Sequence, residues 1–295
     1  MKLCIIYTNC QGCTGINYFL SKSINFCNIY EIKCIENYSF IKNQCEIPID
    51  LFNNCDLFIY QPINDVHGSY STNNIIKLLK DNCIKISFPY IYNTSFYTIY
   101  HENSNNFIPH DFDASLLLNN NNKIILDKFI GHGILDIFNK KYNEHKDINS
   151  IINDYINNNI QFDFKYRFDK CMEILMEKEK YCDIKVSSYI FENYKTKILF
   201  LTHNHPTTYI LLYITNEILK RLNLEIISGT KFLLNESNLS YDINLLNIDK
   251  YNKTYYDFNF NTNDELISDL QNYNFLNIIN DNKTINNIKN IYNVI

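Results

Sequence analysis

Cys10 is the residue of this sequence with the clearest chemical potential. It follows an apolar run, Lys2–Thr8, that is typical of a short buried strand, and it precedes Gly12 and a helical pattern. A thiol between a strand and a helix has backbone N–H groups nearby, which lower its pKa and favour the nucleophilic thiolate. The amides of Asn9 and Gln11 could supply an oxyanion hole. The alternative is a small buried residue in a turn.

His205 is the candidate base for this thiol. It stands in a loop after a predicted strand, Lys197–Leu201, and directly before Pro206, which is expected to open a helix. If this strand joins the sheet that contains the strand before Cys10, both side chains reach the carboxyl edge of the sheet, where ligands bind. The imidazole could then take the thiol proton. His203 is expected to point the other way, and a structural or surface histidine is the alternative for both.

Cys10 and Cys13 also form a Cys-x-x-Cys motif, which occurs in thiol–disulfide oxidoreductases and in half of many zinc sites. The usual aromatic residue before the motif and the proline within it are missing. A zinc site would need a second close pair, and His203 with His205 is an unusually tight one. We therefore expect neither a redox motif nor a metal.

Apolar runs and helical periodicity alternate along the chain. This alternation predicts an α/β fold with a parallel-sheet core and helices on both faces. The predicted strands are Lys2–Thr8, Ile29–Cys34, Asp56–Tyr60, Ile84–Phe88 and Lys197–Leu201. The predicted helices are Gly15–Ser23, Ser71–Asp81, Ile148–Asn157, Phe168–Tyr181 and Pro206–Leu222.

Polar and aromatic residues follow the predicted strands. A cleft at the carboxyl edge would be lined by Tyr60, Gln61, Tyr90, Tyr92 and Asn93. Tyrosine rings and amides suit a neutral polyol such as a sugar. The alternative is that these are ordinary core and rim residues. The predicted main domain covers 1–234, with a helical insertion at about 107–194. Residues 235–295 are expected to form a peripheral or partly mobile extension.

The composition limits the class of protein. A net charge of -5 and a pI near 5.8 provide no basic field for a polyanion, so a nucleic-acid partner is not expected. Ten irregularly spaced cysteines in 295 residues favour thiols in a reducing compartment. No signal peptide or membrane span is recognised, which predicts a cytoplasmic protein without membrane insertion. The Asn-, Ile- and Lys-rich composition is typical of an AT-rich genome, such as that of a giant virus.

Several ordered motifs resemble the WcbI family of capsular-polysaccharide acetyltransferases, whose signature is Gly-Asn-Cys-Gln. The resemblance covers about Lys2–Leu222 and is carried by Tyr7–Gln11, Cys55–Pro62, Ser87–Tyr92, Glu177–Asp183, Ile190–Tyr194 and Leu199–Thr207. It implies a relative of the SGNH hydrolases, with a parallel-sheet core of the SGNH or flavodoxin-like kind and a helical elaboration. The resemblance also implies that the protein binds coenzyme A and acetylates a sugar.

The same resemblance implies roles for particular residues. Cys10 would be the nucleophile and His205 the base. The candidates for the oxyanion or acceptor site are Asn9, Gln11, Gln61 and Asn204, and those for the substrate cleft are Tyr90, Tyr92 and His203. Two positions depart from the expected pattern: Thr8 replaces the family's glycine, and Thr202 replaces the aspartate of SGNH enzymes, which leaves Glu179 or Asp183 to orient the base.

The expected activity is the transfer of an acetyl group from acetyl-CoA, without a metal, to a hydroxyl or amine of a sugar in glycan biosynthesis. A nucleotide-linked deoxy- or amino-sugar is the expected acceptor. In a direct variant His205 deprotonates the acceptor while Cys10 only polarises the donor. The rival functions are a carbohydrate esterase and a non-catalytic module that partners a glycosyltransferase. A thioester-cleavage assay with and without sugar separates the three.

Overall fold

The computed structural model describes residues 1–93, 95–96, 164–228 and 254–259. The chain divides into two compact units, one of 1–93 and 170–244 and the other of 94–169 and 245–295. The helix expected at Ile148–Asn157, most of the insertion at 107–194 and most of the extension at 235–295 lie outside the described residues. The predicted domain boundaries therefore stay predictions.

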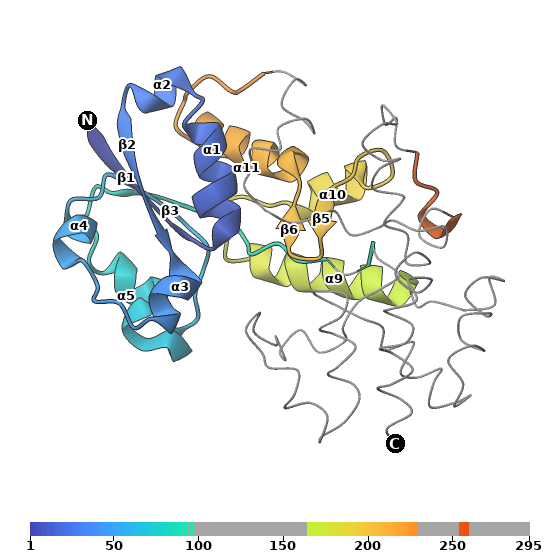
Figure 1. The fold of residues 1–295 in the computed structure, drawn as a ribbon, viewed down its shortest axis with the longest axis horizontal. Coiled ribbons are helices and arrows are strands. Elements are labelled where there is room, and N and C mark those ends of the chain that lie inside the picture. The colour runs from blue at the N-terminus through green and yellow to red at the C-terminus, as the bar shows by residue number, and fades with distance from the viewer. Residues whose placement is uncertain (94, 97–163, 229–253, 260–295) are drawn as a thin grey trace, which may run out of the picture. The chain divides into compact units, whose positions relative to one another are not determined.

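Four parallel strands form the sheet of the first unit (Figure 1). They are β1 (Lys2–Thr8), β2 (Tyr30–Glu36), β3 (Leu57–Tyr60) and β4 (Ile84–Ser87), in the order β2-β1-β3-β4. In the register, β1 lies between β2 and β3, with Ile6 paired to Cys34 on one side and to Ile59 on the other. The predicted α/β fold with a parallel sheet is confirmed, and the four predicted strands of the N-terminal part are present.

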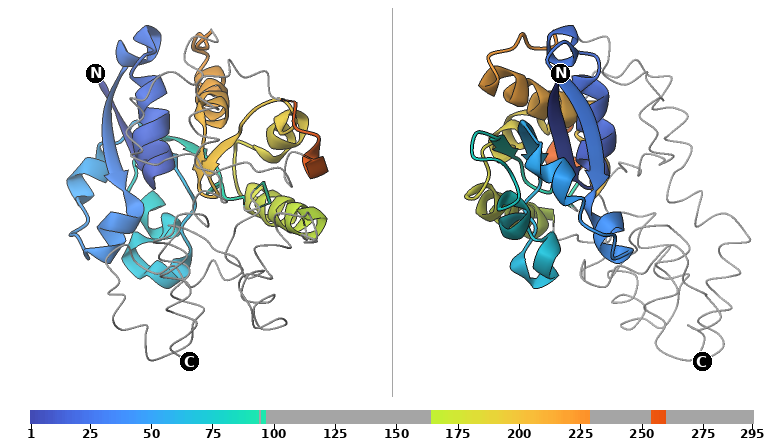
Figure 2. Two further views of the ribbon diagram at one scale, coloured as in Figure 1. Left: turned by 45° about the vertical axis from the view of Figure 1, so that its right-hand side comes forward. Right: turned by 90° about the vertical axis from the view of Figure 1, so that its left-hand side faces the viewer.

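One face of β1 packs against a helical layer that begins directly after the strand. A π-helix, η1 (Gln11–Ile16), continues into α1 (Asn17–Leu20), and α11 (Thr208–Arg221) lies beside α1 (Figure 2). The approach is close because residue 15 is glycine: a Cβ there would lie 2.6 Å from Leu211 Cδ1. A further short helix, α2 (Ile24–Cys27), leads into β2.

The other face of β1 covers the larger aromatic core. Ile5 and Tyr7 pack with Phe52, Phe58 and Ile75, all of which are buried. This layer is built from α3 (Asn37–Lys42), α4 (Ile49–Asn53), the 3-10 segment η2 (Asp65–Tyr70) and α5 (Thr72–Ile76). Ser71 caps α5, since its Oγ accepts a hydrogen bond from Asn74 N. The helix is shorter than the predicted Ser71–Asp81.

The segment 164–221 adds α9 (Phe164–Glu179), α10 (Ser187–Asn193), β5 (Phe200–Thr202), β6 (His205–Pro206) and α11. The prediction that the strand at Lys197–Leu201 joins the main sheet is wrong. The strand is β5, and it pairs antiparallel with β6 in a separate two-stranded sheet.

The start of α11 also differs from the prediction. Pro206 lies in β6, and the helix begins at Thr208 with Thr207 as N-cap. Thr207 N donates to Leu199 O, and Thr207 Oγ1 donates to Ile198 O, both at 2.8 Å. These bonds keep the backbone extended through Thr207, so the helix cannot start at the proline.

The second unit is described in three short pieces, which share an aromatic cluster. Tyr256 Oη donates to Ser95 O at 2.9 Å and to Phe164 O at 3.2 Å. Phe96 packs against the rings of Phe168 and Tyr256. These contacts join segments that are far apart in the sequence.

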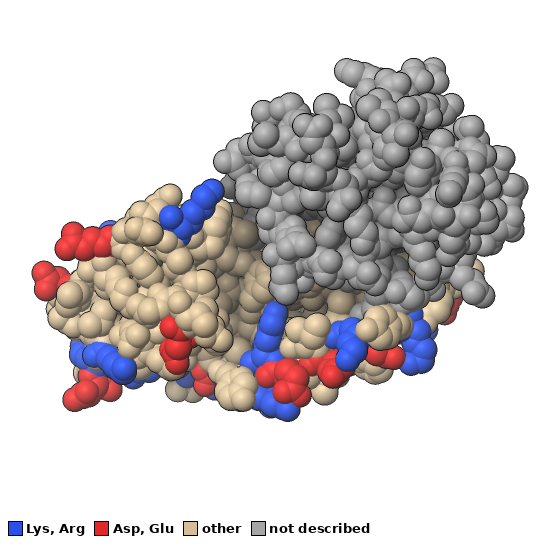
Figure 3. Space-filling model, turned by 90° about the horizontal axis from the view of Figure 1, so that it is seen from below, with Lys and Arg blue, Asp and Glu red and all other residues tan. Residues whose placement is uncertain are grey.

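Charged residues of both signs are interspersed on the described surface seen in Figure 3. Within the described ranges, no helix is long and apolar enough to cross a membrane.

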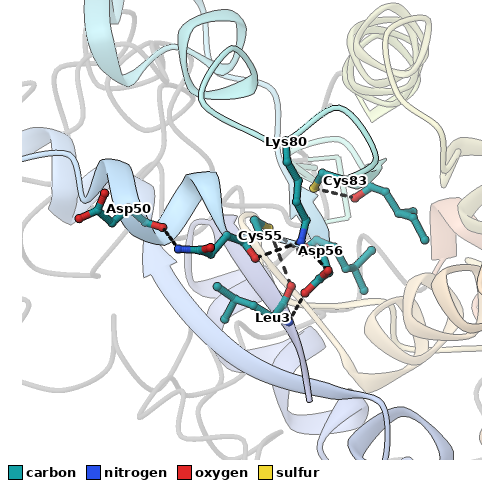
Figure 4. A network of polar contacts seen from close by, with 9 residues as sticks. Leu3, Asp50, Cys55, Asp56, Lys80 and Cys83 are labelled. Atoms are coloured by element: carbon teal, nitrogen blue, oxygen red, sulfur yellow. Dashed lines mark hydrogen bonds and ion pairs between the residues drawn. The ribbon is translucent and has the colours of Figure 1, made fainter.

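A charged network holds the amino ends of β1 and β3 together (Figure 4). Asp56 Oδ2 accepts from Leu3 N at 2.7 Å, and Asp56 Oδ1 lies 2.6 Å from Lys80 Nζ. The Lys80 ammonium and the Leu3 N–H hold the pKa of this carboxyl below its usual range. The carboxylate therefore sets the register of the central strands at the end opposite to Cys10.

We expect Asp56→Asn to destabilise the protein at pH 7 by about 1 kcal/mol, because the amide loses the charge-assisted bonds. Since the folded-state pKa is lowered, this contribution is present above the unfolded-state pKa of about 3.9 and is lost as the pH falls through the folded-state pKa. Urea unfolding of both proteins between pH 7 and pH 3 measures the difference. Glu31→Gln, which removes an exposed ion pair with Lys33, is the control and should leave the unfolding midpoint unchanged. An Asp56→Asn effect that stays constant over this pH range would contradict the assignment.

Candidate active site

Cys10 occupies the turn between β1 and η1, where the backbone reverses tightly. It is the N-cap residue of η1, and Asn9 O accepts from Gly12 N at 3.1 Å and from Cys13 N at 3.0 Å. A Cβ on Gly12 would lie only 2.1 Å from Thr8 Oγ1, so position 12 must be glycine while position 8 is threonine. The departure at Thr8 is thus accommodated, with Thr8 Oγ1 donating to Asn9 O at 2.9 Å.

Cys10 and His205 meet in the structure. Cys10 Sγ lies 3.9 Å from His205 Nε2, which is within hydrogen-bonding reach for sulfur. The thiol is half-buried and the imidazole is buried. The two side chains lie together as predicted, but His205 belongs to β6 of the two-stranded sheet and does not follow a strand of the main sheet.

Two buried glutamines join the turn that carries His205 to the ends of the parallel strands. Gln11 Nε2 donates to Ile91 O at 2.7 Å and to Asn204 O at 2.9 Å, while its Oε1 accepts from Ile91 N at 3.1 Å. Gln61 Nε2 donates to Gln11 Oε1 at 2.9 Å, and Gln61 Oε1 accepts from Asn9 N at 3.0 Å. We call this set of contacts the amide network.

The amide network uses the hydrogen-bonding capacity of both glutamines. The two N–H groups of the Gln11 amide are occupied by Ile91 and Asn204, and those of Gln61 by Gln11 and Pro89 O, the latter at 3.4 Å. In this arrangement neither amide has a donor left for a substrate. Asn9 differs, because its Oδ1 accepts from Gln11 N at 2.9 Å and its Nδ2 has no partner among the described residues.

Burial raises the pKa of Cys10 to about 11, with a further rise from the Glu36 carboxylate. The backbone N–H groups of Cys10 and Gln11 act in the opposite direction, as predicted, but they do not outweigh burial. The predicted net lowering is therefore wrong. At pH 7 only about one thiol in ten thousand would be ionised, so the nucleophile depends on a base.

The second cysteine of the motif has different neighbours. Cys13 Sγ approaches Ile6 O and Thr8 O at 3.6 Å, and Cys34 Sγ approaches Cys13 O at 3.7 Å. The adjacent Cys34 thiol is the main cause of the lowered pKa of Cys13. None of the ten cysteines forms a disulfide bond. No group of three or more potential metal ligands gathers in the part of the chain that the structure describes.

The three cleft candidates lie next to one another. The rings of Tyr90 and Tyr92 are 6.4 Å apart, and Tyr92 contacts the ring of His203 edge-on at 5.1 Å. Burial raises the pKa of Tyr90 to about 12, with a smaller contribution from the Cys10 thiol, while a hydrogen bond with the Asn204 side chain lowers it. His203 O also accepts from Asn93 N at 2.7 Å. The aromatic residues and the Cys10–His205 pair therefore belong to one site.

Comparisons with known proteins identify the family of the chain and its fold. A protein-family model described as "Polysaccharide biosynthesis enzyme WcbI" matches residues 3–125 and 126–226, which is more than half of the chain. The chain belongs to the WcbI family. This confirms the resemblance found in the sequence motifs.

A solved structure of WcbI, described as a polysaccharide biosynthesis enzyme in its native form without a disulfide bond between coenzyme A and a cysteine, has the same fold. It matches with a TM-score of 0.55 and 14% sequence identity over 99% of each chain. None of the curated proteins matches the chain in sequence.

The two acidic residues suggested as orienters of His205 have other partners in this WcbI-family fold. Asp183 Oδ2 accepts from Ser87 N at 2.8 Å and from Ser87 Oγ at 2.7 Å, next to the end of β4. Glu179 accepts from Val186 N, Ser187 N and Ser187 Oγ at the start of α10. These carboxylates position secondary structure.

Sequence reasoning missed Lys178, whose Nζ lies 5.1 Å from the centre of the Tyr90 ring. The motif Glu177–Asp183 and the predicted helix both include this position, but neither assigns a role to the lysine.

We expect alkylation of Cys10 by iodoacetamide to accelerate with pH until about pH 11, because the raised pKa keeps the thiol protonated at lower pH. Cys13, whose pKa is lowered, should reach its half-maximal rate at a lower pH than Cys10. Peptide mass spectrometry after timed quenching measures both residues in one sample. A Cys10 rate that is already at its plateau at pH 7 would show a preformed thiolate and contradict the assignment.

Proposed function

We propose that this WcbI-family protein is an acetyl-CoA-dependent acetyltransferase that acetylates a hydroxyl or amine of a sugar. The observation that carries the proposal is the 3.9 Å approach of Cys10 Sγ to His205 Nε2, at the carboxyl edge of a parallel sheet. The family's description as a polysaccharide biosynthesis enzyme supports a carbohydrate pathway, and coenzyme A in the description of the related structure supports the donor.

In the first half-reaction, His205 Nε2 takes the proton of the Cys10 thiol as the sulfur attacks the thioester carbonyl of acetyl-CoA. The tetrahedral intermediate collapses, the bond from carbon to the CoA sulfur breaks, and the imidazolium returns its proton to the leaving thiolate. The acetyl group is then held as a thioester on Cys10. The pKa of about 11 makes the histidine necessary, because the thiol alone is almost wholly protonated at neutral pH.

Asn9 is the side chain that we assign to the oxyanion. Its Oδ1 is held by Gln11 N, which orients Nδ2 as the remaining donor beside the nucleophile. Gln11 and Gln61 act instead as positioning residues through the amide network, because their N–H groups are already engaged. Asn204 positions the turn through its backbone oxygen and contacts Tyr90 through its side chain.

In the second half-reaction, His205 deprotonates the acceptor as it attacks the acetyl-cysteine, and the proton then passes to the released Cys10 sulfur. Tyr90, Tyr92 and His203 provide ring faces for the C–H surface of a sugar. We propose a deoxy- or amino-hexose linked to a nucleotide as the acceptor. The expected cytoplasmic location and the absence of a nucleic-acid partner stay predictions.

Cys10→Ala should abolish acetyl transfer, whereas Cys13→Ala should retain substantial activity, because only the Cys10 sulfur lies beside the base. The assay measures thioester cleavage and acetyl-sugar formation from acetyl-CoA with a panel of nucleotide sugars and amino sugars, in the presence of a chelator. Cleavage of the acetyl-CoA thioester in the absence of any sugar would favour an esterase-like hydrolase. Equal loss in both variants, with a redox-sensitive disulfide between the two cysteines, would favour a dithiol enzyme. If acetyl transfer fails with every sugar but occurs on a protein lysine, the carbohydrate assignment is wrong.

His205→Ala should lower the transfer rate by about a hundred-fold or more, the usual scale for loss of a general base. His203→Ala is the matched control, since its ring contacts Tyr92, and it should have a much smaller effect on kcat. Steady-state kinetics of both variants at saturating acetyl-CoA measure the difference. The reverse order would assign the base to His203.

A further inference from the structure

Lys178 is a cation placed against the aromatic side of the candidate active site. It lies near the end of α9, with its Nζ 5.1 Å from the centroid of the Tyr90 ring. At this distance the ammonium is attracted by the face of the ring, which orients it without neutralising its charge. The two residues come from elements that are far apart in the sequence, so tertiary packing creates the contact.

Tyr90 connects this lysine to the reacting groups. Its side chain hydrogen-bonds with Asn204, and its pKa is raised in part by the Cys10 thiol. The Asn204 backbone oxygen accepts from Gln11, the residue that follows the nucleophile. A ligand group held by Lys178 would therefore lie near Tyr90, on the side of the site that also contains Cys10 and His205.

The charge of Lys178 is not balanced by a carboxylate among the described residues. The acidic residues nearest to it in sequence are engaged elsewhere: Glu177 pairs with Lys180 at 2.5 Å, and Glu179 caps α10. Lys178 is exposed as a whole residue, yet desolvation of its ammonium is the main cause of its lowered pKa. An exposed ammonium that lies against the Tyr90 ring, with no carboxylate partner among the described residues, is accessible to a bound anion.

We propose that Lys178 is the phosphate-binding residue of this site and that it holds the diphosphate group of a bound substrate. The inference rests on the proposed function, in which acetyl-CoA and a nucleotide sugar both carry a diphosphate. A lysine ammonium binds phosphate as a point charge, and the adjacent Tyr90 ring provides a surface for the group attached to it. Lys178 thus determines the affinity for one of the two substrates and is not a catalytic residue.

The test compares Lys178→Gln with Lys178→Arg, which keeps the charge, and with Lys180→Gln as the matched control on the same helix. Isothermal titration calorimetry measures the binding of inorganic pyrophosphate, CoA, pantetheine and UDP-N-acetylglucosamine to each protein. Thermal melting checks that all variants are folded.

We expect Lys178→Gln to weaken pyrophosphate binding about ten-fold, Lys178→Arg to retain most of it, and Lys180→Gln to bind like the wild type. Pantetheine, which lacks the diphosphate, should bind all proteins equally. A loss confined to CoA identifies the donor as the source of the phosphate, and a loss confined to the UDP-sugar identifies the acceptor. In turnover, KM for that substrate should rise with little change in kcat.

The inference is overturned if Lys178→Gln binds every phosphate-bearing probe like the wild type, or if the wild type binds none of them. These results are distinguishable from a failure of the proposed function. If the protein transfers no acetyl group but its pyrophosphate affinity depends on Lys178, the phosphate site stands and the acetyltransferase assignment fails. If acetyl transfer requires Cys10 but Lys178→Gln changes neither KM nor the affinity for any phosphate-bearing probe, the acetyltransferase assignment stands and the phosphate site fails.

Discussion

The amide network of Gln11 and Gln61 is the interaction on which the site depends. Through the Gln11 amide, the turn after β1 is bonded to the segment after β4 at Ile91 and to the turn between β5 and β6 at Asn204. Gln61 adds the end of β3. Four segments that are distant in sequence are thereby fixed within hydrogen-bonding distance. Because the amides are buried, any displacement would leave unpaired polar groups, which is what makes the arrangement specific.

The chemistry of the Cys10–His205 pair follows from this construction. The turn that holds Cys10 is closed by backbone bonds to Asn9 O and by the contact between Thr8 and Gly12, and it is half-buried. Burial outweighs the nearby N–H groups and keeps the thiol protonated. A thiol of this kind becomes a nucleophile only when a base lies beside it, and the separate β5–β6 sheet brings His205 there. Lys178 and Tyr90 place a positive charge and an aromatic ring next to this pair.

Much of this fold could be predicted from local sequence patterns, because buried parallel strands such as β1 and β3 contain continuous apolar runs. The sequence analysis predicted that Cys10 and His205 meet, but its premise of a shared sheet is wrong, because β5 pairs with β6 in a separate sheet. β5 and β6 form a tight local hairpin, but where this hairpin lies relative to Cys10 depends on long-range contacts such as that between Gln11 and Asn204. For the same reason the sequence could not separate the engaged amides of Gln11 and Gln61 from that of Asn9. The pKa of Cys10 depends on burial, which a motif does not reveal.

The central claim is that Cys10 carries the acetyl group between donor and acceptor, and a single-turnover experiment tests it most directly. The protein is mixed with acetyl-CoA in the absence of any acceptor, quenched in acid within a range of short times, and digested for peptide mass spectrometry. The account predicts one acetyl group on Cys10 that disappears when the acceptor sugar is added, and that forms more slowly in His205→Ala. Release of CoA in the presence of sugar with Cys10 unmodified at every time point, or acetylation of another residue on the reaction pathway, would contradict it.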